Sequence, residues 1–349
     1  MNRMKLILSF FMIYFLGPQY SWGHYDFEFS GKESDWIEFE VSSKEIKSLQ
    51  FNFEVIGGKK TFIRDLVAPN GKVIIKSNYA TPSSQRIPPW IYSTIGNKVR
   101  PTYVVDGLFS IIVNDSINGM DNKTGMWKLR LVDGNGQSNK KVFIHKNTLT
   151  REEATLQKGM KIKLHHQGLI DPLALELAIE DLEKIYRDYG LSIDIVIKDN
   201  WQDPLEETND LEKKIQEFTK GRRNEVQIYL FSRGKVSDQK DFQGLASCLP
   251  GFISQKIDKH CALAIGFTPR VEINFNKLKK VVGHELAHYL GLFHLEDDYY
   301  PFGRRDDGLE DTHSGNESSN FMHKTSEYFE VIEFTSQQIT KMLSHPELF

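Results

Sequence analysis

Residues 284–294 read His-Glu-Leu-Ala-His-Tyr-Leu-Gly-Leu-Phe-His, which matches the spacing H-E-x-x-H-x-x-G-x-x-H. Residues four apart on an α-helix lie on one face, so His284 and His288 can present their imidazoles to a single metal ion. Glu285 projects about 100° further round the helix, so its carboxylate is expected beside the metal rather than on it. The first half of the stretch therefore predicts two metal ligands and a neighbouring acid or base.

The second half of the stretch predicts a third ligand. Gly291 permits a backbone conformation with positive φ, which would end the helix and turn the chain back to bring His294 to the metal. An unbroken helix would carry His294 off the ligand face. Five fixed positions match by accident in roughly one chain in ten thousand of this length, so a helix with unrelated, structurally satisfied histidines is the weaker interpretation.

The flanking residues favour a helix through this stretch. Asn276 is the expected N-cap, and no proline lies between it and the motif. Leu286, Leu290 and Phe293 form an apolar stripe at three- and four-residue spacing, which is typical of a helix with one face in a core.

The donor set predicts a catalytic zinc ion rather than a structural one. Three histidine ligands leave the fourth position open, whereas structural sites usually fill all four positions with protein side chains. The pattern predicts a zinc-dependent endopeptidase, in which Glu285 acts as general base toward a zinc-activated water. The motif does not exclude a zinc hydrolase of non-peptide amides. An exported binding or adhesion module with a silent zinc domain is a further alternative, and the intact Glu285 argues against it.

The motif and a downstream turn resemble the metzincin clan of zinc metallopeptidases, from about residue 160 to the end of the chain. The Met-turn that this clan shares is expected at Asn320-Phe321-Met322. The resemblance implies that Met322 packs beneath the metal as a hydrophobic support rather than as a ligand. Residues 308–342 look most like the pappalysin-like branch. Many members of the clan place a tyrosine two residues after the methionine, where this chain has Lys324; Tyr328 is a substitute for it or a packing residue.

The same resemblance implies an α/β fold for residues 149–349, with a twisted mixed sheet behind the zinc helix. Alternating strand and helix patterns agree with this: strands are expected at 161–165, 193–197, 226–231 and 262–267, and helices at 172–189, between Asp171 as cap and Gly190, and at 205–218. Between residues 244 and 250 the resemblance places an edge strand, which could bind an extended peptide by strand addition. A disulfide-tied loop is the alternative there.

Residues 24–148 are expected to form a separate antiparallel β-sandwich. Short alternating runs at 36–41, 49–55, 109–113 and 126–132 are separated by turn residues and have no helical period. The Ala68-Pro69-Asn70-Gly71 turn and the run from Gly125 to Asp133 are similar to the jelly-roll P-domain of proprotein convertases. The similarity implies an accessory or folding role, with a pro-segment as the alternative.

Residues 1–23 have the pattern of a secretory signal peptide, with basic residues near the start, an apolar run from 6 to 16 and small residues near the expected cleavage site. The apolar run is short for a membrane span. We therefore expect a secreted or periplasmic protein that has no stable membrane insertion after the leader is removed. A short anchor left in place is the alternative.

The remaining features concern cross-links, ions and partners. Cys248 and Cys261 are the two cysteines of the chain, and an oxidising compartment favours a disulfide between them over two buried thiols. The acidic segment 296–311 is expected to be a solvated loop, with calcium as an alternative that lacks a regular ligand spacing. A formal net charge of -3 without a basic patch gives no support for nucleic-acid binding, so the expected partner is a protein or peptide substrate. No pattern indicates an oligomeric state.

Overall fold

The computed structural model describes the chain in separate ranges. These are residues 23–29, 33–42, 45–56, 61–76, 108–114, 124–133, 140–152, 155–156, 158–166, 171–198, 225–231, 235–236, 240–241, 244–246, 251, 262–266, 275–299, 303–307, 309, 311–312, 319–323, 333–346 and 348. The cleavage region of the expected leader and the helix expected at 205–218 lie outside these ranges.

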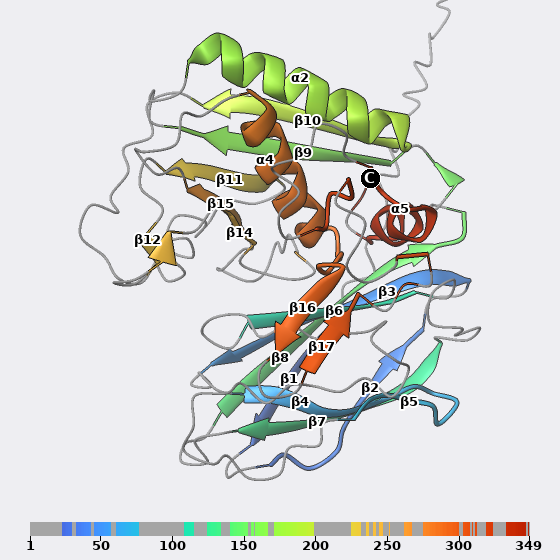
Figure 1. The fold of residues 1–349 in the computed structure, drawn as a ribbon. Coiled ribbons are helices and arrows are strands. Elements are labelled where there is room, and N and C mark those ends of the chain that lie inside the picture. Colours follow the sequence, from blue (N-terminus) through green and yellow to red (C-terminus); the bar gives the residue numbers. More distant parts are fainter. Residues whose placement is uncertain are drawn as a thin grey trace, which may run out of the picture.

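The strands β1 to β8 form two four-stranded antiparallel sheets, which we call the N-terminal sheet pair (Figure 1). One sheet has the order β1-β8-β3-β6 and the other the order β2-β7-β4-β5. The strands are β1 (Gly23–Phe29), β2 (Ile37–Val41), β3 (Ile46–Ile56), β4 (Thr61–Val67), β5 (Val73–Lys76), β6 (Leu108–Asn114), β7 (Gly125–Asp133) and β8 (Lys140–Thr150). The four strands expected from alternation in this half are all present.

The two sheets pack face to face around an apolar core. In β2 the buried residues Ile37, Phe39 and Val41 alternate with exposed glutamates, because successive side chains of a strand point to opposite faces. Aromatic rings from both sheets meet at the centre. The Phe51 ring of β3 lies 5.1 Å from the Phe39 ring and 5.0 Å from the Trp127 ring of β7.

A mixed five-stranded sheet follows, in the order β10-β9-β11-β15-β14. Its strands are β9 (Lys158–His165), β10 (Leu191–Lys198), β11 (Val226–Phe231), β14 (Gly244–Ala246) and β15 (Ala262–Gly266). The first four strands in the sheet order are parallel, and β14 pairs antiparallel with β15 at the edge. The described chain between residues 244 and 250 thus contains the short edge strand, and a small ribbon of β12 (Lys235–Val236) and β13 (Lys240–Asp241) precedes it.

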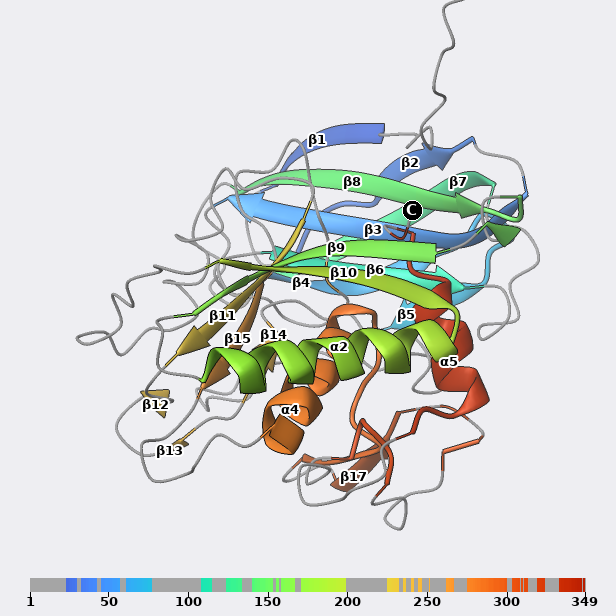
Figure 2. The same cartoon turned by 90° about the horizontal axis from the view of Figure 1, so that it is seen from above.

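Helix α2 (Pro172–Asp188) packs on the mixed sheet and has the ends expected from its sequence (Figure 2). The Asp171 side chain accepts a hydrogen bond from the Leu173 backbone N–H at 3.2 Å, which satisfies one of the unpaired donors at the start of the helix. Gly190 follows the last turn with a φ of +86°, a conformation that favours glycine.

Helix α4 (Phe275–Tyr289) carries the histidine motif and packs against α2 and the strands β14 and β15. The Tyr186 hydroxyl of α2 donates to the Gly283 carbonyl at 2.9 Å, and Lys279 forms an ion pair with Asp181 at 2.5 Å. The expectation that Asn276 caps this helix is wrong, because the helix already begins at Phe275 and its first turn therefore includes Asn276.

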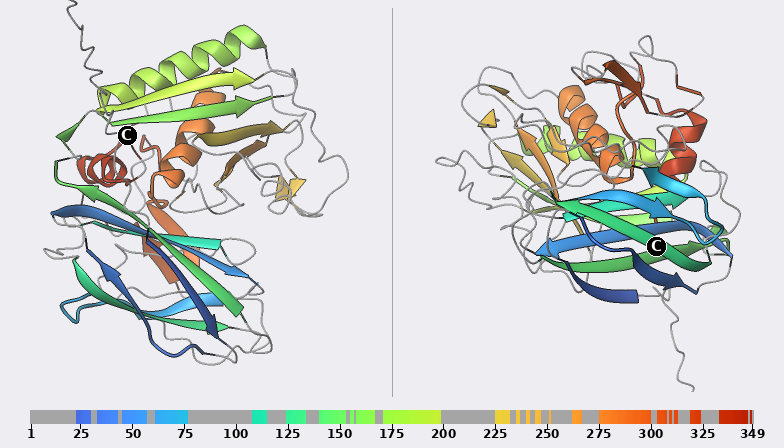
Figure 3. Two further views of the ribbon diagram at one scale, coloured as in Figure 1. Left: turned by 180° about the vertical axis from the view of Figure 1, so that it is seen from behind. Right: turned by 90° about the horizontal axis from the view of Figure 1, so that it is seen from below.

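The last described part of the chain holds a hairpin and the helix α5 (Ser336–Leu343). The hairpin pairs β16 (Glu296–Tyr299) with β17 (Gly303–Asp306) antiparallel. Figure 3 places α5 beside the N-terminal sheet pair, and the Asn114 side chain of β6 donates a hydrogen bond to the Ser344 hydroxyl at the end of α5. The C-terminal helix therefore contacts both halves of the molecule.

One expectation about this region needs correction. The acidic segment was expected as a solvated loop, but it contains the β16–β17 hairpin, because strand pairing uses backbone groups that a run of charges does not report. Asp307 is buried and accepts hydrogen bonds from the Leu309 N–H and the Thr312 hydroxyl. Strand β8 stays paired with β3 as far as Thr150, and the division of the chain between residues 148 and 149 stays a prediction.

None of the helices in the described ranges is long and apolar enough to cross a membrane.

Candidate metal centre

The end of α4 turns the chain back in the way that the glycine of the motif predicts. The backbone N–H of Leu292 bonds to the carbonyl of Ala287 at 3.0 Å, and the N–H of Gly291 bonds to the carbonyl of His288 at 2.9 Å. This pair of bonds is a Schellman motif, and Gly291 occupies its left-handed position with a φ of +97°. The reversal returns the chain to the face of α4 that carries the first two histidines, and His294 follows.

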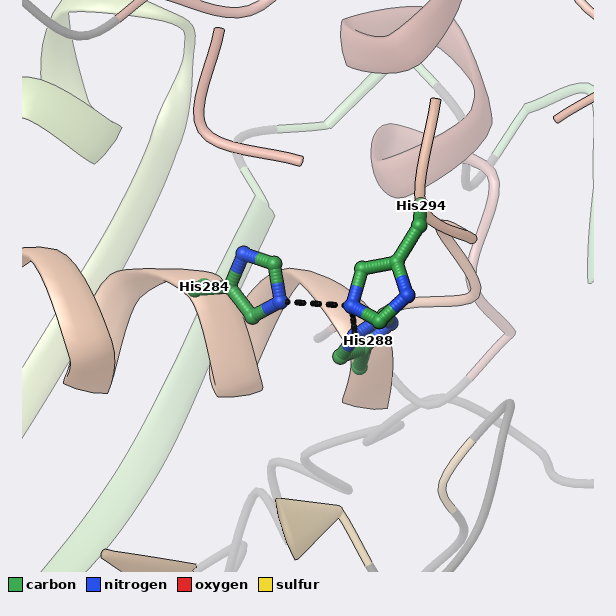
Figure 4. Close-up of side chains that lie close together, drawn as sticks. All are labelled: His284, His288 and His294. Carbon is green, nitrogen blue, oxygen red and sulfur yellow. Dashed lines mark hydrogen bonds between the residues drawn. The ribbon is translucent and has the colours of Figure 1, made fainter. Parts of the chain in front are cut away.

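The three histidines of the motif meet at one point (Figure 4). The Nε2 atom of His294 lies 3.0 Å from Nε2 of His284 and 3.1 Å from Nε2 of His288. One nitrogen from each ring lies within 4.8 Å of the others. Among the described residues, no other group of three histidine, cysteine or acidic side chains comes so close together.

Backbone carbonyls orient two of these rings. Nδ1 of His284 lies 2.6 Å from the carbonyl oxygen of Phe321, and Nδ1 of His288 lies 2.8 Å from that of Leu292. A carbonyl oxygen only accepts, so each Nδ1 must carry the proton and donate it. In the neutral rings the Nε2 atoms are therefore unprotonated and present lone pairs to the centre, which is the tautomer that metal-bound histidines adopt.

The segment expected as the Met-turn bonds to the chain at two places around the histidine cluster. Residues 320–323 make a turn in which His323 N–H bonds to the Asn320 carbonyl at 3.1 Å. Met322 is completely buried, and its carbonyl accepts a hydrogen bond at 3.2 Å from Leu295, the residue after His294. The turn thus fixes the chain next to His294, and through the Phe321 carbonyl it orients His284.

The donor set fits a zinc ion. Three nitrogens bound to one zinc at about 2.0–2.1 Å in tetrahedral geometry lie about 3.3 Å apart, close to the separations that His294 makes with its two partners. Burial and the neighbouring His284 and His294 hold the pKa of His288 well below its usual range. His288 is therefore neutral at physiological pH, the form that binds a metal. The three imidazoles could hold one metal ion.

Glu285 lies against the edge strand of the mixed sheet. A Cβ atom added to Gly244 would come within 2.2 Å of Glu285 Oε1 and 2.5 Å of its Cδ, so the carboxylate occupies the space beside the missing side chain. Burial raises the pKa of Glu285 to about 8, although a hydrogen bond with the backbone of Ala246 lowers it. The strand β14 therefore both makes room for the acid and binds it.

Other sequence-predicted residues lie outside the described ranges. Cys248 and Cys261 are among them, so the disulfide stays a prediction, as do the roles of Lys324 and Tyr328. The calcium alternative also stays untested, but two acids of that segment have structural partners. Besides Asp307, the Asp311 carboxylate accepts hydrogen bonds from the Thr335 hydroxyl at 2.9 Å and the Gln337 N–H at 2.8 Å, at the start of α5.

Sequence reasoning missed the backbone groups and glycines around the centre. The Phe321 and Leu292 carbonyls orient ligands, and Gly244 and Gly251 lie against Glu285 and Tyr289. A carbonyl is present at every residue and therefore leaves no residue-type signal. The glycines, by contrast, are visible in the sequence, and Gly244 at the expected edge strand could have been identified as a point of close approach.

Comparisons with known proteins give only remote similarities. No protein-family model matches the chain, and no curated protein is detectably similar to it in sequence. The chain is similar to the crystal structure of archaemetzincin from Methanopyrus kandleri at 16% identity and a TM-score of 0.32, over 54% of this chain and 88% of that one. It is also similar to a glycosylation associate protein complex from Streptococcus agalactiae at 10% identity and a TM-score of 0.11, over 60% and 58% of the two chains. At TM-scores this low, neither similarity assigns a fold or an activity.

Proposed function

We propose that this chain is an exported zinc-dependent endopeptidase of the metzincin type. His284, His288 and His294 hold the zinc ion, and Glu285 is the general base. The substrate is a protein or peptide. The observation that carries the proposal is the convergence of the three Nε2 atoms, two of them on rings whose opposite nitrogens are tied to carbonyl oxygens.

The zinc ion and Glu285 would have separate roles in the reaction. A zinc ion supplies Lewis acidity, which polarises a scissile carbonyl and makes hydroxide available near neutral pH. Glu285 accepts a proton from the attacking water at a carboxylate oxygen and passes it to the departing amine. Burial raises the pKa of Glu285 to about 8 in the metal-free chain, and a zinc cation beside the carboxylate would favour its ionised form, which is the form that accepts the proton.

The finer features of the proposal rest on the sequence patterns. The N-terminal pattern of a signal peptide supports export to a secreted or periplasmic location, without stable membrane insertion of the mature protein. The burial of Met322 and the backbone bond from Leu295 to its carbonyl support a Met-turn. We propose a jelly-roll-like sandwich for the N-terminal sheet pair and a metzincin α/β domain for the mixed sheet. The pappalysin-like branch rests on the resemblance of residues 308–342 alone.

A hydrolase of non-peptide amides is the competing activity, because the same zinc and Glu285 chemistry cleaves any amide that fits the site. A strand at the edge of the sheet beside Glu285 favours an extended peptide, since β14 has one side free of a strand partner within the described sheet. A silent zinc domain in a binding or adhesion module is disfavoured by the buried, oriented Glu285.

Digestion of a diverse peptide library by the mature protein tests the proposal. Wild type, a metal-chelated sample, Glu285→Ala, His288→Ala and the exposed-helix control Glu176→Ala are compared, with zinc content measured for each. We expect cleavage only by wild type and the control. Glu285→Ala should keep stoichiometric zinc, whereas His288→Ala should lose it.

Three other outcomes would redirect the assignment. Cleavage by Glu285→Ala at the wild-type rate would remove Glu285 as the base. A zinc-loaded wild type that cleaves small amides but no peptide would favour the non-peptide hydrolase. A wild type that binds zinc without hydrolysing either substrate would favour the binding module.

A further inference from the structure

One face of the N-terminal sheet pair is polar and yet buried. Along β3, the apolar residues Leu49, Phe51 and Phe53 point into the core between the two sheets. The alternate residues of the strand point the other way and are also buried; they are Ser48, Gln50 and Asn52. The outer face of a sheet is usually solvated when it is polar, so the rest of the chain covers this one.

Gln50 is the residue on this face that reaches the C-terminal half. Its Nε2 donates to the carbonyl oxygen of Gly251 at 2.7 Å, across an interval of 201 residues. The same Nε2 donates to the Ser110 hydroxyl at 3.0 Å, and the Asn147 amide donates to Gln50 Oε1 at 3.5 Å. Both polar atoms of the amide therefore have partners, and a buried, fully bonded amide is held in one orientation.

Gly251 joins three elements at the end of the zinc helix. Its N–H donates to the carbonyl of Tyr289 at 2.7 Å, which satisfies one of the carbonyls left unpaired at the end of α4. Its own carbonyl accepts from Gln50 and also from Nε2 of His345 at 3.1 Å. A Cβ at this position would lie 2.1 Å from the Tyr289 ring, so only glycine fits here.

Two glycines, Gly244 of β14 and Gly251, lie against α4. Gly244 lies against Glu285, and Gly251 lies against Tyr289, the neighbour of the ligand His288. The strand β14 therefore lies beside the proposed base, and Gly251 bonds the last residue of the helix that carries the motif. A shift of Gly251 would be transmitted to Tyr289.

We propose that Gln50 is a positioning residue for the metal centre: its amide fixes Gly251, and Gly251 fixes the end of the helix that carries His284, Glu285 and His288. The expected effect of Gln50 on catalysis rests on the proposed function. The positioning of the helix end by Gln50 does not. With this role for Gln50, the N-terminal sheet pair stays part of the active protein and is not a pro-segment that is removed by cleavage.

Two isosteric substitutions on the same buried face separate positioning from general stability. Gln50→Met removes the amide that donates to Gly251. Asn52→Leu removes an amide from the same strand face whose oxygen accepts from the Ser110 hydroxyl and which makes no side-chain bond to Gly251. Each is measured by thermal unfolding, by hydrogen exchange of residues 286–292 in the metal-free protein, by the visible spectrum after cobalt substitution, and by kcat and KM.

Gln50→Met should speed amide exchange at Leu290, Gly291 and Leu292 by about tenfold or more relative to Asn52→Leu at matched stability. Its cobalt spectrum should change and its metal affinity should fall about tenfold, as for other residues that orient ligands indirectly. We expect kcat to fall while KM is retained. Asn52→Leu should keep the wild-type spectrum, affinity and kcat.

Equal exchange rates and an unchanged cobalt spectrum in Gln50→Met would overturn the proposal. If this variant does not fold, His345→Phe is used in its place, since it removes the second donor to the Gly251 carbonyl and retains a ring against Tyr289. For that variant too, exchange rates equal to those of the control and an unchanged cobalt spectrum would overturn the proposal. A wild type that cleaves no peptide rejects the endopeptidase, while the exchange rates still decide whether Gln50 positions the helix end.

Discussion

The carboxylate of Glu285 fills the place of a side chain at Gly244. The two residues come from the ligand helix and the edge strand, and a Cβ on Gly244 would lie 2.2 Å from Glu285 Oε1 and 2.5 Å from Glu285 Cγ. Because the contact includes Cγ as well as the carboxylate, rotating the end of the side chain does not relieve it. The position of the proposed base therefore depends on the absence of a side chain across from it.

Gly244→Ala should displace Glu285 and leave the histidines in place. We expect kcat to fall by about two orders of magnitude, within the range that a misplaced general base costs, with zinc content unchanged. Steady-state kinetics and metal analysis on the same sample check this. A variant with wild-type kcat would mean that the carboxylate has another position in the active protein.

His288→Ala should abolish the stabilisation that zinc gives to the folded chain. A ligand that binds only the native state stabilises it by mass action, by about 2.7 kcal/mol at a hundredfold excess over Kd, and so raises Tm. Wild type should therefore melt at a higher temperature with zinc than with chelator, and His288→Ala should melt at one temperature in both. An equal zinc shift in both proteins would place the ion elsewhere.

Gly291→Ala should destabilise the fold and weaken the metal site together. An alanine at φ +97° costs roughly 1–2 kcal/mol, and relaxing that strain moves the chain that leads to His294. Gly71→Ala is the matched control, because Gly71 has a φ of +82° in open space far along the chain from the motif. Urea unfolding should give similar losses for both variants, and zinc titration should be altered only in Gly291→Ala.

His345 should make stability fall in mildly acidic solution. Burial lowers the pKa of His345 to about 4, although its hydrogen bond to Gly251 raises it, whereas an unfolded histidine has a pKa of 6.5. Between pH 4 and pH 6.5, His345 binds a proton in the unfolded chain but not in the folded chain. The contribution of neutral His345 to the free energy of unfolding is therefore fully present above pH 6.5. It is lost as the pH falls toward 4, at about 1.4 kcal/mol per pH unit.

Urea unfolding of metal-free wild type and His345→Phe across this pH range measures the effect. The free energy of unfolding should fall less steeply with decreasing pH in the variant, and the difference in slope isolates His345 from the other buried histidines, His288 among them. Parallel slopes for the two proteins would show that residue 345 is solvated or charged in the folded state.

Local features of this fold could be predicted from the sequence because their causes lie within a few residues. Asp171 and Gly190 marked the two ends of α2, and the spacing of His284 and His288 placed both on one face of α4. Gly291 predicted the reversal that brings in His294, and the positive φ confirms that expectation. Each of these effects follows from helix geometry, a cap or a backbone angle, which neighbouring residues determine.

The surroundings of the metal centre were decided by contacts between distant parts of the chain. Phe321 orients His284 through a carbonyl 37 residues away, and Gln50 reaches Gly251 across 201 residues. The buried polar face of β3 also had the alternation of an ordinary solvated strand, so the sequence alone determined that the strand exists and not what covers it. Alternation and helical period report one element at a time, whereas hydrogen bonds between elements arise only when the chain has packed.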